Sequence, residues 1–407
     1  MSAPKLPAHT TPGPQFPPVR PVGFPANKED IVFDPLVHLQ LEPLRYVKTL
    51  RGTDVPFPVP VRRTEQAART AEDGFPGLAY SAPFRVLSDE GVRALRRCID
   101  QNEEHATSVP SRVPKCLRGL GYRSKFIHDL GYSPEVLRHL SGASGIEVTP
   151  HSMGSNLAQT NFGEIGTGSK VDQWHLDSVP YVMVLLCSDA TDMVGGELKV
   201  ARIPGSQGGE SDPATTLDLI KRDEIPEAFI DTVNYKGAGY AIFMQGSRIA
   251  HSVTAVTAAR EPRITLVNSY QSCNPFTPDS TVFRTFQTMK DGEGEDRAPY
   301  EFARHVAWRV SGQMGYLLNE DSMFGGERRG DVTAVLDRAA AELARARDLI
   351  SGKAVEEAVY ATEGEASQQA GRAIKMYEEK KKKAQRAGGT ITANTKKELP
   401  RKHTSRL

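Results

Sequence analysis

The chain has 407 residues, of which 39% are hydrophobic, and a formal net charge of +1. No apolar run nears the roughly 20 residues that a transmembrane helix requires, so we expect a globular protein that does not bind membranes. Residues 371–407 hold twelve Lys or Arg against three Glu, which leaves the rest of the chain acidic and argues against a nucleic-acid groove. The four cysteines lack Cys-x-x-Cys spacing, which disfavours a zinc site or a disulfide framework and indicates a reducing, intracellular compartment.

The N-terminal part of the chain predicts an arm followed by helices. Residues 1–75 are rich in proline, and we interpret them as an arm that packs on the main domain, with one short element over 33–50. The first amphipathic helix is predicted from Ser88, a suitable N-cap, to Ile99. A second helix begins at Pro134, since proline is favoured at the first helical position. We expect both helices to cover one face of a sheet.

Short strand-like segments then follow in quick succession. They span residues 146–150, 157–162, 179–187, 197–203, 239–244, 247–253 and 263–270. Many short strands separated by turns are typical of a double-sheet jelly roll, so we predict a mainly β (α+β) domain with flanking helices over residues 76–275. Residues 205–230 interrupt these strands with a charged helical stretch, which is either a lid over a site or a solvated excursion.

One stretch of the sequence carries candidate metal ligands. His175 and Asp177 stand two residues apart before a long apolar segment, so in extended backbone their side chains share a face. His251 follows a later strand-like run and is the best candidate for a third ligand. Two imidazoles and one carboxylate make the facial triad of non-haem iron sites, which leaves positions open for substrates. Twelve positions further, Arg263 opens another strand and offers a guanidinium to a dicarboxylate.

This ordered set resembles the Fe(II)/2-oxoglutarate-dependent oxygenase superfamily over roughly residues 150–275. The resemblance implies that His175, Asp177 and His251 bind Fe(II) and act in catalysis. It implies that Arg263 pairs with the distal carboxylate of 2-oxoglutarate, and that Thr265, on the same strand face, hydrogen-bonds that carboxylate. The implied fold is a double-stranded β-helix, or jelly-roll, core with helical N- and C-terminal extensions.

Arg260 is the alternative to Arg263, because the arginine of the superfamily usually lies slightly closer to the second histidine. Pro262 indicates a turn at this point, which leaves Arg263 as the inward residue of the strand.

The resemblance further implies an enzyme that uses O2 and couples decarboxylation of 2-oxoglutarate to succinate with oxidation of a small molecule, such as an amino acid or a secondary metabolite. Hydroxylation is the default outcome, with desaturation and ring closure as alternatives. Asp177 disfavours halogenation, because halogenating relatives carry a small residue in its place. Trp174 and Tyr181 flank the ligand pair and are candidates for the substrate wall. Polar residues that could orient a substrate or 2-oxoglutarate are Gln159, Asn161, Gln173, Asn268 and Gln271.

Two other functions stay open. The first is a cupin-type iron oxygenase without a co-substrate, against which Arg263 and Thr265 argue. The second is a non-catalytic barrel that holds a ligand or scaffolds partners, against which the intact set of three ligands argues.

The C-terminal part is predicted to be helical. Residues 276–362 form an extension with helices over 300–317 and 331–350, which packs on the barrel or mediates a homodimer. The apolar residues assigned to one side of the second helix are Val332, Val335, Leu336, Ala339, Leu343 and Leu349. Residues 363–407 are expected to be a disordered basic tail. The final Ser405-Arg406-Leu407 resembles the peroxisomal Ser-Lys-Leu address, so we expect a cytoplasmic or peroxisomal protein.

Overall fold

The computed structural model describes residues 31–49, 54–56, 77–109, 112–201, 213–288, 297–318 and 329–356. The chain divides into two compact units, Met1–Thr362 and Glu363–Leu407. The predictions for residues 1–30, for the basic tail and for the C-terminal tripeptide lie outside the described residues, as does part of the 205–230 insertion. Among the helices that are described, none is both long and apolar enough to cross a membrane.

The larger sheet of the described chain has eleven strands, which pair in antiparallel fashion. They are β1 Tyr46–Thr49, β2 Asp54–Pro56, β3 Leu78–Ser81, β4 Phe84–Arg85, β5 Thr107–Val109, β6 Val113–Leu117, β7 Val148–Pro150, β8 Gln159–Gly163, β10 Tyr181–Leu186, β14 Tyr240–Met244 and β17 Arg263–Ser272. The order through its centre is β3-β14-β10-β17-β8-β6. The long strand β17 therefore lies in the middle of the sheet.

A smaller sheet of four strands has the order β13-β12-β15-β9. Its strands are β9 Asp172–His175, β12 Leu198–Ala201, β13 Ile230–Val233 and β15 Ala250–Val253, and a separate pair joins β11 Val194–Gly195 to β16 Val256–Ala258. From β8 onward the chain passes back and forth between the two larger sheets. The structure is thus a mostly antiparallel β fold with several helices, as expected from the sequence.

The two sheets pack face to face, and the side chains along each strand point alternately toward the space between the sheets and away from it. On β10, Val182 and Val184 belong to a buried cluster that also contains Leu198 and Val200 of the smaller sheet. Met183, the residue between the two valines, points the other way and joins a second cluster. Successive side chains of a strand project to opposite faces, so one strand contributes to both clusters.

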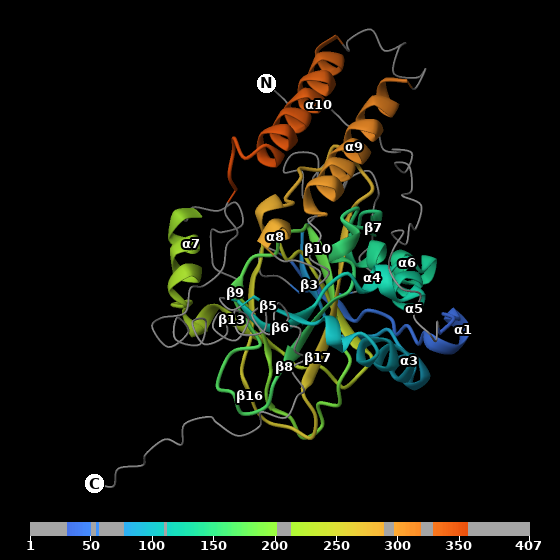
Figure 1. Cartoon of the computed structure of the whole chain (residues 1–407), viewed down its shortest axis with the longest axis vertical. Coiled ribbons are helices and arrows are strands. Elements are labelled where there is room, and N and C mark those ends of the chain that lie inside the picture. The colour runs from blue at the N-terminus through green and yellow to red at the C-terminus, as the bar shows by residue number, and fades with distance from the viewer. Residues whose placement is uncertain are drawn as a thin grey trace, which may run out of the picture. The chain divides into compact units, whose positions relative to one another are not determined.

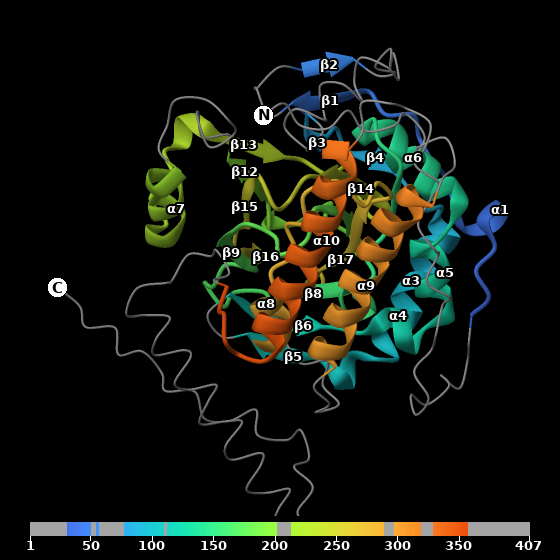
Figure 2. The same cartoon turned by 90° about the horizontal axis from the view of Figure 1, so that it is seen from above.

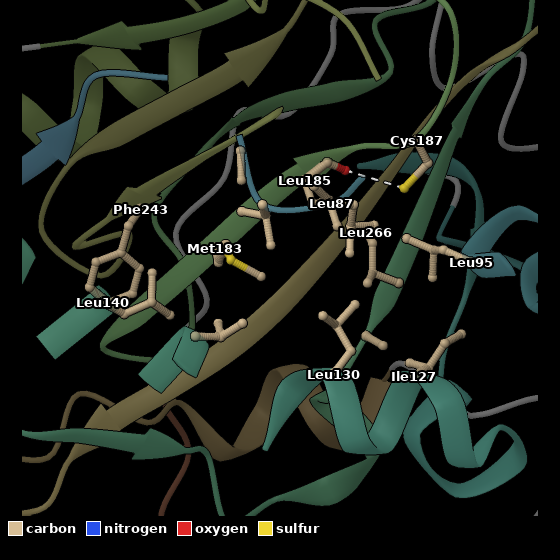
Figure 3. Packing of buried hydrophobic residues seen from close by; sticks show 14 of the residues in the cluster. Leu87, Leu95, Ile127, Leu130, Leu140, Met183, Leu185, Cys187, Phe243 and Leu266 are labelled. Carbon is tan, nitrogen blue, oxygen red and sulfur yellow. Dashed lines mark hydrogen bonds between the residues drawn. The ribbon is translucent and has the colours of Figure 1, made fainter. Parts of the chain in front are cut away.

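Helices cover the outer face of the larger sheet. They are α1 Pro35–His38, α3 Asp89–Asp100, α4 Leu120–Arg123, α5 Lys125–Gly131 and α6 Pro134–Ser144. Ser88 caps α3 by accepting a hydrogen bond from Gly91 N, as predicted, and Pro134 occupies the first turn of α6. Figure 3 shows Ile127 and Leu130 of α5 directed at Met183 and Leu266 of the sheet.

On the opposite side of the molecule, α7 (Pro213–Arg222) lies against the smaller sheet (Figure 1). Its Ile220 packs with Trp174, Ala201 and Ala250 in a small cluster of its own. Part of the predicted insertion is therefore a helix that covers the outer face of β9 and β15.

Within the described residues, three helices follow β17: α8 Phe283–Thr288, α9 Ala298–Leu317 and α10 Arg329–Ile350. Figure 2 shows α9 and α10 side by side. Phe302 and Val306 of α9 and Ala346 and Leu349 of α10 join the cluster between the sheets.

The apolar side predicted for α10 is wrong in part. Val335, Ala339 and Leu349 are buried, whereas Val332, Leu336 and Leu343 remain 42%, 49% and 51% exposed. The helix buries only a narrow stripe against its neighbours. An apolar residue that is displaced from that stripe around the helix axis therefore stays in contact with solvent. The homodimer expected from this helix stays a prediction.

Candidate metal and co-substrate site

Two histidines are brought together by strand pairing in the smaller sheet. His175 is the last residue of β9, and His251 lies in β15 as its cross-strand Cα partner. Partners across an antiparallel pair have side chains on the same face, and here the two ring centroids are 4.1 Å apart. Asp177 lies just beyond the end of β9, where its backbone N–H donates to the Gly246 carbonyl at 2.9 Å. The strand thus ends before Asp177, yet Asp177 still reaches the same pocket.

The three side chains converge on one point. Asp177 Oδ1 lies 3.4 Å from His175 Nε2, and Asp177 Oδ2 lies 3.4 Å from His251 Nε2. One ligand atom from each residue lies within 4.8 Å of the others, and both histidines are buried. Two imidazoles and one carboxylate in this arrangement can hold one transition-metal ion on a single face and leave further positions open.

Backbone carbonyls fix the tautomer of both rings. His175 Nδ1–H donates to the Gln173 carbonyl at 2.6 Å, and His251 Nδ1–H donates to the Ile249 carbonyl at 3.0 Å. A carbonyl oxygen only accepts, so each Nδ1 carries the proton and each Nε2 keeps its lone pair. Metal-binding histidines are oriented in this way by their other nitrogen.

The charges in the pocket favour the protonation states of the side chains that can bind a metal. Burial raises the pKa of the Asp177 carboxyl, but His251, His175 and Arg112 together outweigh burial and hold that pKa well below its usual range. Burial, and then the neighbouring His175, lowers the pKa of His251 to about 4. The carboxylate is therefore ionised and the His251 imidazole neutral at neutral pH, which are the states that bind a metal.

Arg112 and Asp172 support this pocket, and neither was predicted from the sequence. Arg112 Nε donates to Asp172 Oδ1 at 3.0 Å, and its Nη2 lies 3.7 Å from Asp177 Oδ1. Asp172 also accepts from Asn161 Nδ2 at 3.3 Å, and Asn161 Oδ1 accepts from Gln159 Nε2 at 2.8 Å. Arg112 stands 60 residues before Asp172 in the chain, and no local pattern links the two.

The arginine predicted to bind the co-substrate is buried on β17. Arg263 is 1% exposed and its Nη1 donates to Thr265 Oγ1 at 3.2 Å, while its Nη2 is buried and has no hydrogen-bond partner among the described residues. No carboxylate of the described chain lies within ion-pair distance of it. Burial lowers the pKa of Arg263, yet a guanidinium stays protonated in proteins. Arg260, in contrast, is 75% exposed and pairs with Asp192, so it does not reach the pocket.

One cavity contains the ligand set. Its lining includes His175, Asp177, His251 and Thr265, and Arg263 approaches it through its hydrogen bond to Thr265. Of the polar residues proposed from the sequence, Gln159 and Asn161 line this cavity. The others, which are Gln173, Asn268 and Gln271, are buried outside its lining.

The predicted roles of Trp174 and Tyr181 in the substrate wall are wrong. Trp174 precedes His175 in β9 and points to the opposite face, where it packs with Ile220 of α7. Tyr181 is the outward neighbour of Val182 in β10 and stacks on Phe243 beneath the helices. Both follow from the alternation of side chains along a strand.

At another part of the cavity lies a second polar group that the sequence did not reveal. Arg118 is 2% exposed and donates to Asn156 Oδ1 at 2.5 Å, and Asn156 Nδ2 donates to Ser269 Oγ at 2.7 Å. The Arg118 guanidinium lies 5.5 Å from the centroid of the Phe286 ring. Arg118, Asn156, Ser269 and Phe286 all line the cavity.

No family model and no curated protein matches this chain. Among solved structures, the chain is similar to EctD from S. alaskensis with 2-oxoglutarate and 5-hydroxyectoine, at 16% identity over 61% of this chain and 86% of that chain, with a TM-score of 0.35. HygX from Streptomyces hygroscopicus, with nickel, 2-oxoglutarate and hygromycin B bound, is 12% identical over 51% of this chain and 86% of that chain, at a TM-score of 0.35. The non-heme alpha ketoglutarate dependent epimerase SnoN from nogalamycin biosynthesis is 14% identical over 51% and 80%, at a TM-score of 0.35.

Within the described residues, His175, Asp177 and His251 form a set of two buried imidazoles and one half-buried carboxylate that suits a single divalent transition metal.

Proposed function

We propose that this chain is an Fe(II)/2-oxoglutarate-dependent oxygenase that oxidises a small molecule. The observation that carries the proposal is the convergence of His175, Asp177 and His251, with both Nε2 lone pairs and one half-buried carboxylate directed at one point. Arg263 adds a buried cation with an unpartnered Nη2 beside the same cavity. The strand orders β8-β17-β10-β14 and β13-β12-β15-β9 support an eight-stranded jelly roll as the scaffold.

The buried polar atoms of the site fit the two absent groups. Asp177 Oδ2 has no hydrogen-bond partner in the described chain, as expected for an oxygen reserved for a cation. Arg263 Nη2 likewise has no hydrogen-bond partner in the described chain. It could donate to a carboxylate of 2-oxoglutarate, because a guanidinium binds a carboxylate with two parallel hydrogen bonds. When bound, Fe(II) and 2-oxoglutarate supply the activation of O2 and the oxidising power, with release of succinate and CO2.

The residues of the chain have separate tasks in this proposal. His175, Asp177 and His251 would hold the metal, which would supply the chemistry with O2. Arg263 and Thr265 hold the distal carboxylate of 2-oxoglutarate and so orient it toward the metal. Arg112 balances the charge of Asp177. Because a carboxylate occupies the third ligand position, we propose hydroxylation as the reaction, with desaturation or ring closure as alternatives.

The proposal is tested first by the binding of the metal and of 2-oxoglutarate, and then by turnover. Calorimetry with Mn(II) should give one site in the wild type and none in His175→Ala. In the presence of Mn(II), Arg263→Gln should weaken 2-oxoglutarate binding by on the order of 100-fold, because charge-assisted hydrogen bonds to the buried cation are lost. Arg260→Gln, which changes an exposed arginine near the same strand, is the matched control and should bind 2-oxoglutarate as the wild type does.

Succinate release with Fe(II) completes the test. Release that does not depend on added 2-oxoglutarate would favour the cupin-type oxygenase, and a wild type that binds no metal would favour the non-catalytic barrel. Metal binding that survives in His175→Ala would refute the site.

A further inference from the structure

Four polar side chains form a chain of hydrogen bonds that ends at the wall of the cavity. Arg112 Nε donates to Asp172 Oδ1 at 3.0 Å, and Asn161 Nδ2 donates to Asp172 Oδ2 at 3.3 Å. Gln159 Nε2 then donates to Asn161 Oδ1 at 2.8 Å. All four residues line the cavity, and none is more than 9% exposed. The chain of hydrogen bonds therefore connects an ion pair beside the candidate metal ligands with the side chains of β8.

The direction of every hydrogen bond in this chain is fixed by the ion pair at its start. A guanidinium only donates and a carboxylate only accepts. Asn161 must therefore turn its Nδ2 toward Asp172, which leaves its Oδ1 directed at Gln159. Gln159 must in turn present its Nε2 to that oxygen, so its Oε1 lies at the far end of the chain. An isolated amide could be turned either way, but the charges of Arg112 and Asp172 set the orientation of both amides here.

Gln159 Oε1 is an acceptor that reaches the space inside the cavity. No residue in the described part of the chain donates to it, and it is not sealed off by neighbouring atoms as the amide of Gln271 is. Gln159 pairs with Val267 across β8 and β17, and Val267 pairs with Val184 of β10. Both valines line the cavity. A hydrogen-bond acceptor thus stands beside an apolar wall.

The co-substrate cannot donate to this acceptor. 2-Oxoglutarate is ionised at both carboxyl groups at neutral pH and carries only hydrogen-bond acceptors. Thr265, its proposed partner, pairs with Asn161, and Gln159 stands two residues further along β8, which is roughly 7 Å. An acceptor that is left without a donor in a closed site is costly. The donor must therefore come from another molecule held against Val267.

We propose that Gln159 is a specificity-determining residue, and that the molecule oxidised at this site donates a hydrogen bond from a hydroxyl or N–H group to Gln159 Oε1. Its hydrocarbon part packs on Val184 and Val267. A molecule that offers only a carbonyl or carboxylate oxygen at this point is rejected, because two acceptors would face each other. This inference rests on the proposed function, since the metal and 2-oxoglutarate define the space that the substrate occupies.

The test uses the full chain loaded with Mn(II) and 2-oxoglutarate. The probes are alcohols and the ketones of nearly the same shape: cyclopentanol and cyclopentanone, cyclohexanol and cyclohexanone, and 1-phenylethanol and acetophenone. Mn(II) is paramagnetic and broadens the NMR signals of probe protons that lie close to it, so a titration measures binding in this cavity. In at least one pair, the alcohol should bind roughly three- to tenfold more tightly than its ketone, because only the alcohol donates.

Gln159→Met removes the acceptor and keeps the length of the side chain. This variant should bind the alcohol and the ketone of each pair equally. Gln313→Met is the matched control, since it replaces a buried glutamine of α9 whose Nε2 donates to the Pro275 carbonyl and to Glu342, outside the cavity lining. The control should keep the preference of the wild type for alcohols.

Asp172→Asn reverses the chain of hydrogen bonds and leaves Gln159 in place. The new amide must turn its oxygen to Arg112, which only donates, and therefore its NH2 group to Asn161. Each following amide then turns over, and Gln159 presents its Nε2 to the cavity. Ketones should now bind more tightly than their alcohols, by roughly three- to tenfold. A loss of stability alone would not invert this preference.

The failure of this inference is distinguishable from that of the proposed function. If the wild type binds no Mn(II) or no 2-oxoglutarate, the proposed function fails and the inference fails with it. If both bind but no alcohol is preferred over its ketone, only the assignment of Gln159 is overturned. The same conclusion follows if Gln159→Met or Asp172→Asn keeps the preference of the wild type.

Discussion

The backbone of Gly246 lies directly against the carboxylate of Asp177. The Gly246 carbonyl accepts the Asp177 N–H at 2.9 Å, and a Cβ placed on Gly246 would lie 1.9 Å from Asp177 Oδ2. Gly246 belongs to the loop between β14 and β15, the strand that carries His251. One glycine thus orients Asp177 at a point where no other residue fits.

Gly246→Ala should weaken metal binding without unfolding the chain. The added methyl group displaces the Asp177 carboxylate from the two Nε2 atoms, and we expect Mn(II) affinity to fall on the order of 100-fold. Isothermal calorimetry measures this loss. Gly315→Ala is the control, because a Cβ at Gly315 meets nothing within 4 Å, and alanine in a helix should if anything raise stability. Equal metal affinity in Gly246→Ala and the wild type would show that Asp177 does not bind the ion.

Gly196 lies against the side chain of Arg263, as Gly246 lies against that of Asp177. Its φ is +72°, and a Cβ there would lie 2.8 Å from Arg263 Cδ. Gly196→Ala should shift the guanidinium and raise the KM for 2-oxoglutarate by on the order of tenfold, because small displacements of positioning groups are costly. Gly166→Ala is a close match, since its φ is +71° but nothing lies within 4 Å of its Cβ position. Both variants carry the same backbone strain, of about 1–2 kcal/mol, so a KM that rises equally in both would exclude the contact with Arg263 as the cause.

The sequence predicts the parts of this site that depend on local pattern. His175 and Asp177 are two residues apart, and Arg263 and Thr265 share one face of β17, as strand alternation requires. The same alternation, applied to Trp174, places its ring on the opposite face, which the prediction of a substrate wall overlooked. Residue types and spacing thus locate the ligands but not the side chains around them.

The residues that sequence reasoning missed are connected only through the fold. Arg112 approaches Asp172 and Asp177 because β6 pairs with β8 in the larger sheet. Arg118 reaches the cavity from the loop after β6 and is held by Asn156, 38 residues later. Contacts of this kind depend on which strands pair, and a single sequence carries no periodic signal for them.

Because His151 is buried, we predict that the folded chain loses stability in mild acid. Burial, and then the neighbouring His305, lowers the pKa of His151 well below its ordinary value of about 6.5. Above that pH the residue is neutral in both the folded and the unfolded chain, so its protonation does not lower the free energy of unfolding. As the pH falls, only the unfolded chain gains the proton, so stability declines by up to about 1.4 kcal/mol per pH unit until the folded pKa is reached.

The measurement compares urea unfolding of the wild type and His151→Asn at pH 7.5, 6.5 and 5.5. Asparagine can accept the Met153 N–H that His151 Nδ1 accepts at 3.2 Å, but it does not titrate. Because all other histidines are common to both proteins, the wild type should lose about 1 kcal/mol more than the variant between pH 6.5 and 5.5. Parallel losses in the two proteins would mean that His151 is protonated in the folded chain.

An ion pair that is mostly shielded from solvent links α9 with α10. Arg309 Nε and Nη2 donate to the two oxygens of Glu342, each at 2.9 Å, and Gln313 Nε2 donates to the same carboxylate. Glu342→Gln removes the carboxylate that Arg309 and Arg338 both contact and leaves only the charge of Asp279 beside the Arg309 guanidinium. We expect a loss of about 2 kcal/mol in the free energy of unfolding. The double variant Arg309→Met, Glu342→Leu removes both charges and should recover part of that loss, because an apolar pair needs no desolvation of ions while Arg338 and Asp279 each lose one partner. Glu90→Gln, in an exposed pair with Arg93, is the control and should leave the unfolding midpoint unchanged. If the double variant is as unstable as Glu342→Gln, the two helices are held by packing around the pair and not by its charges.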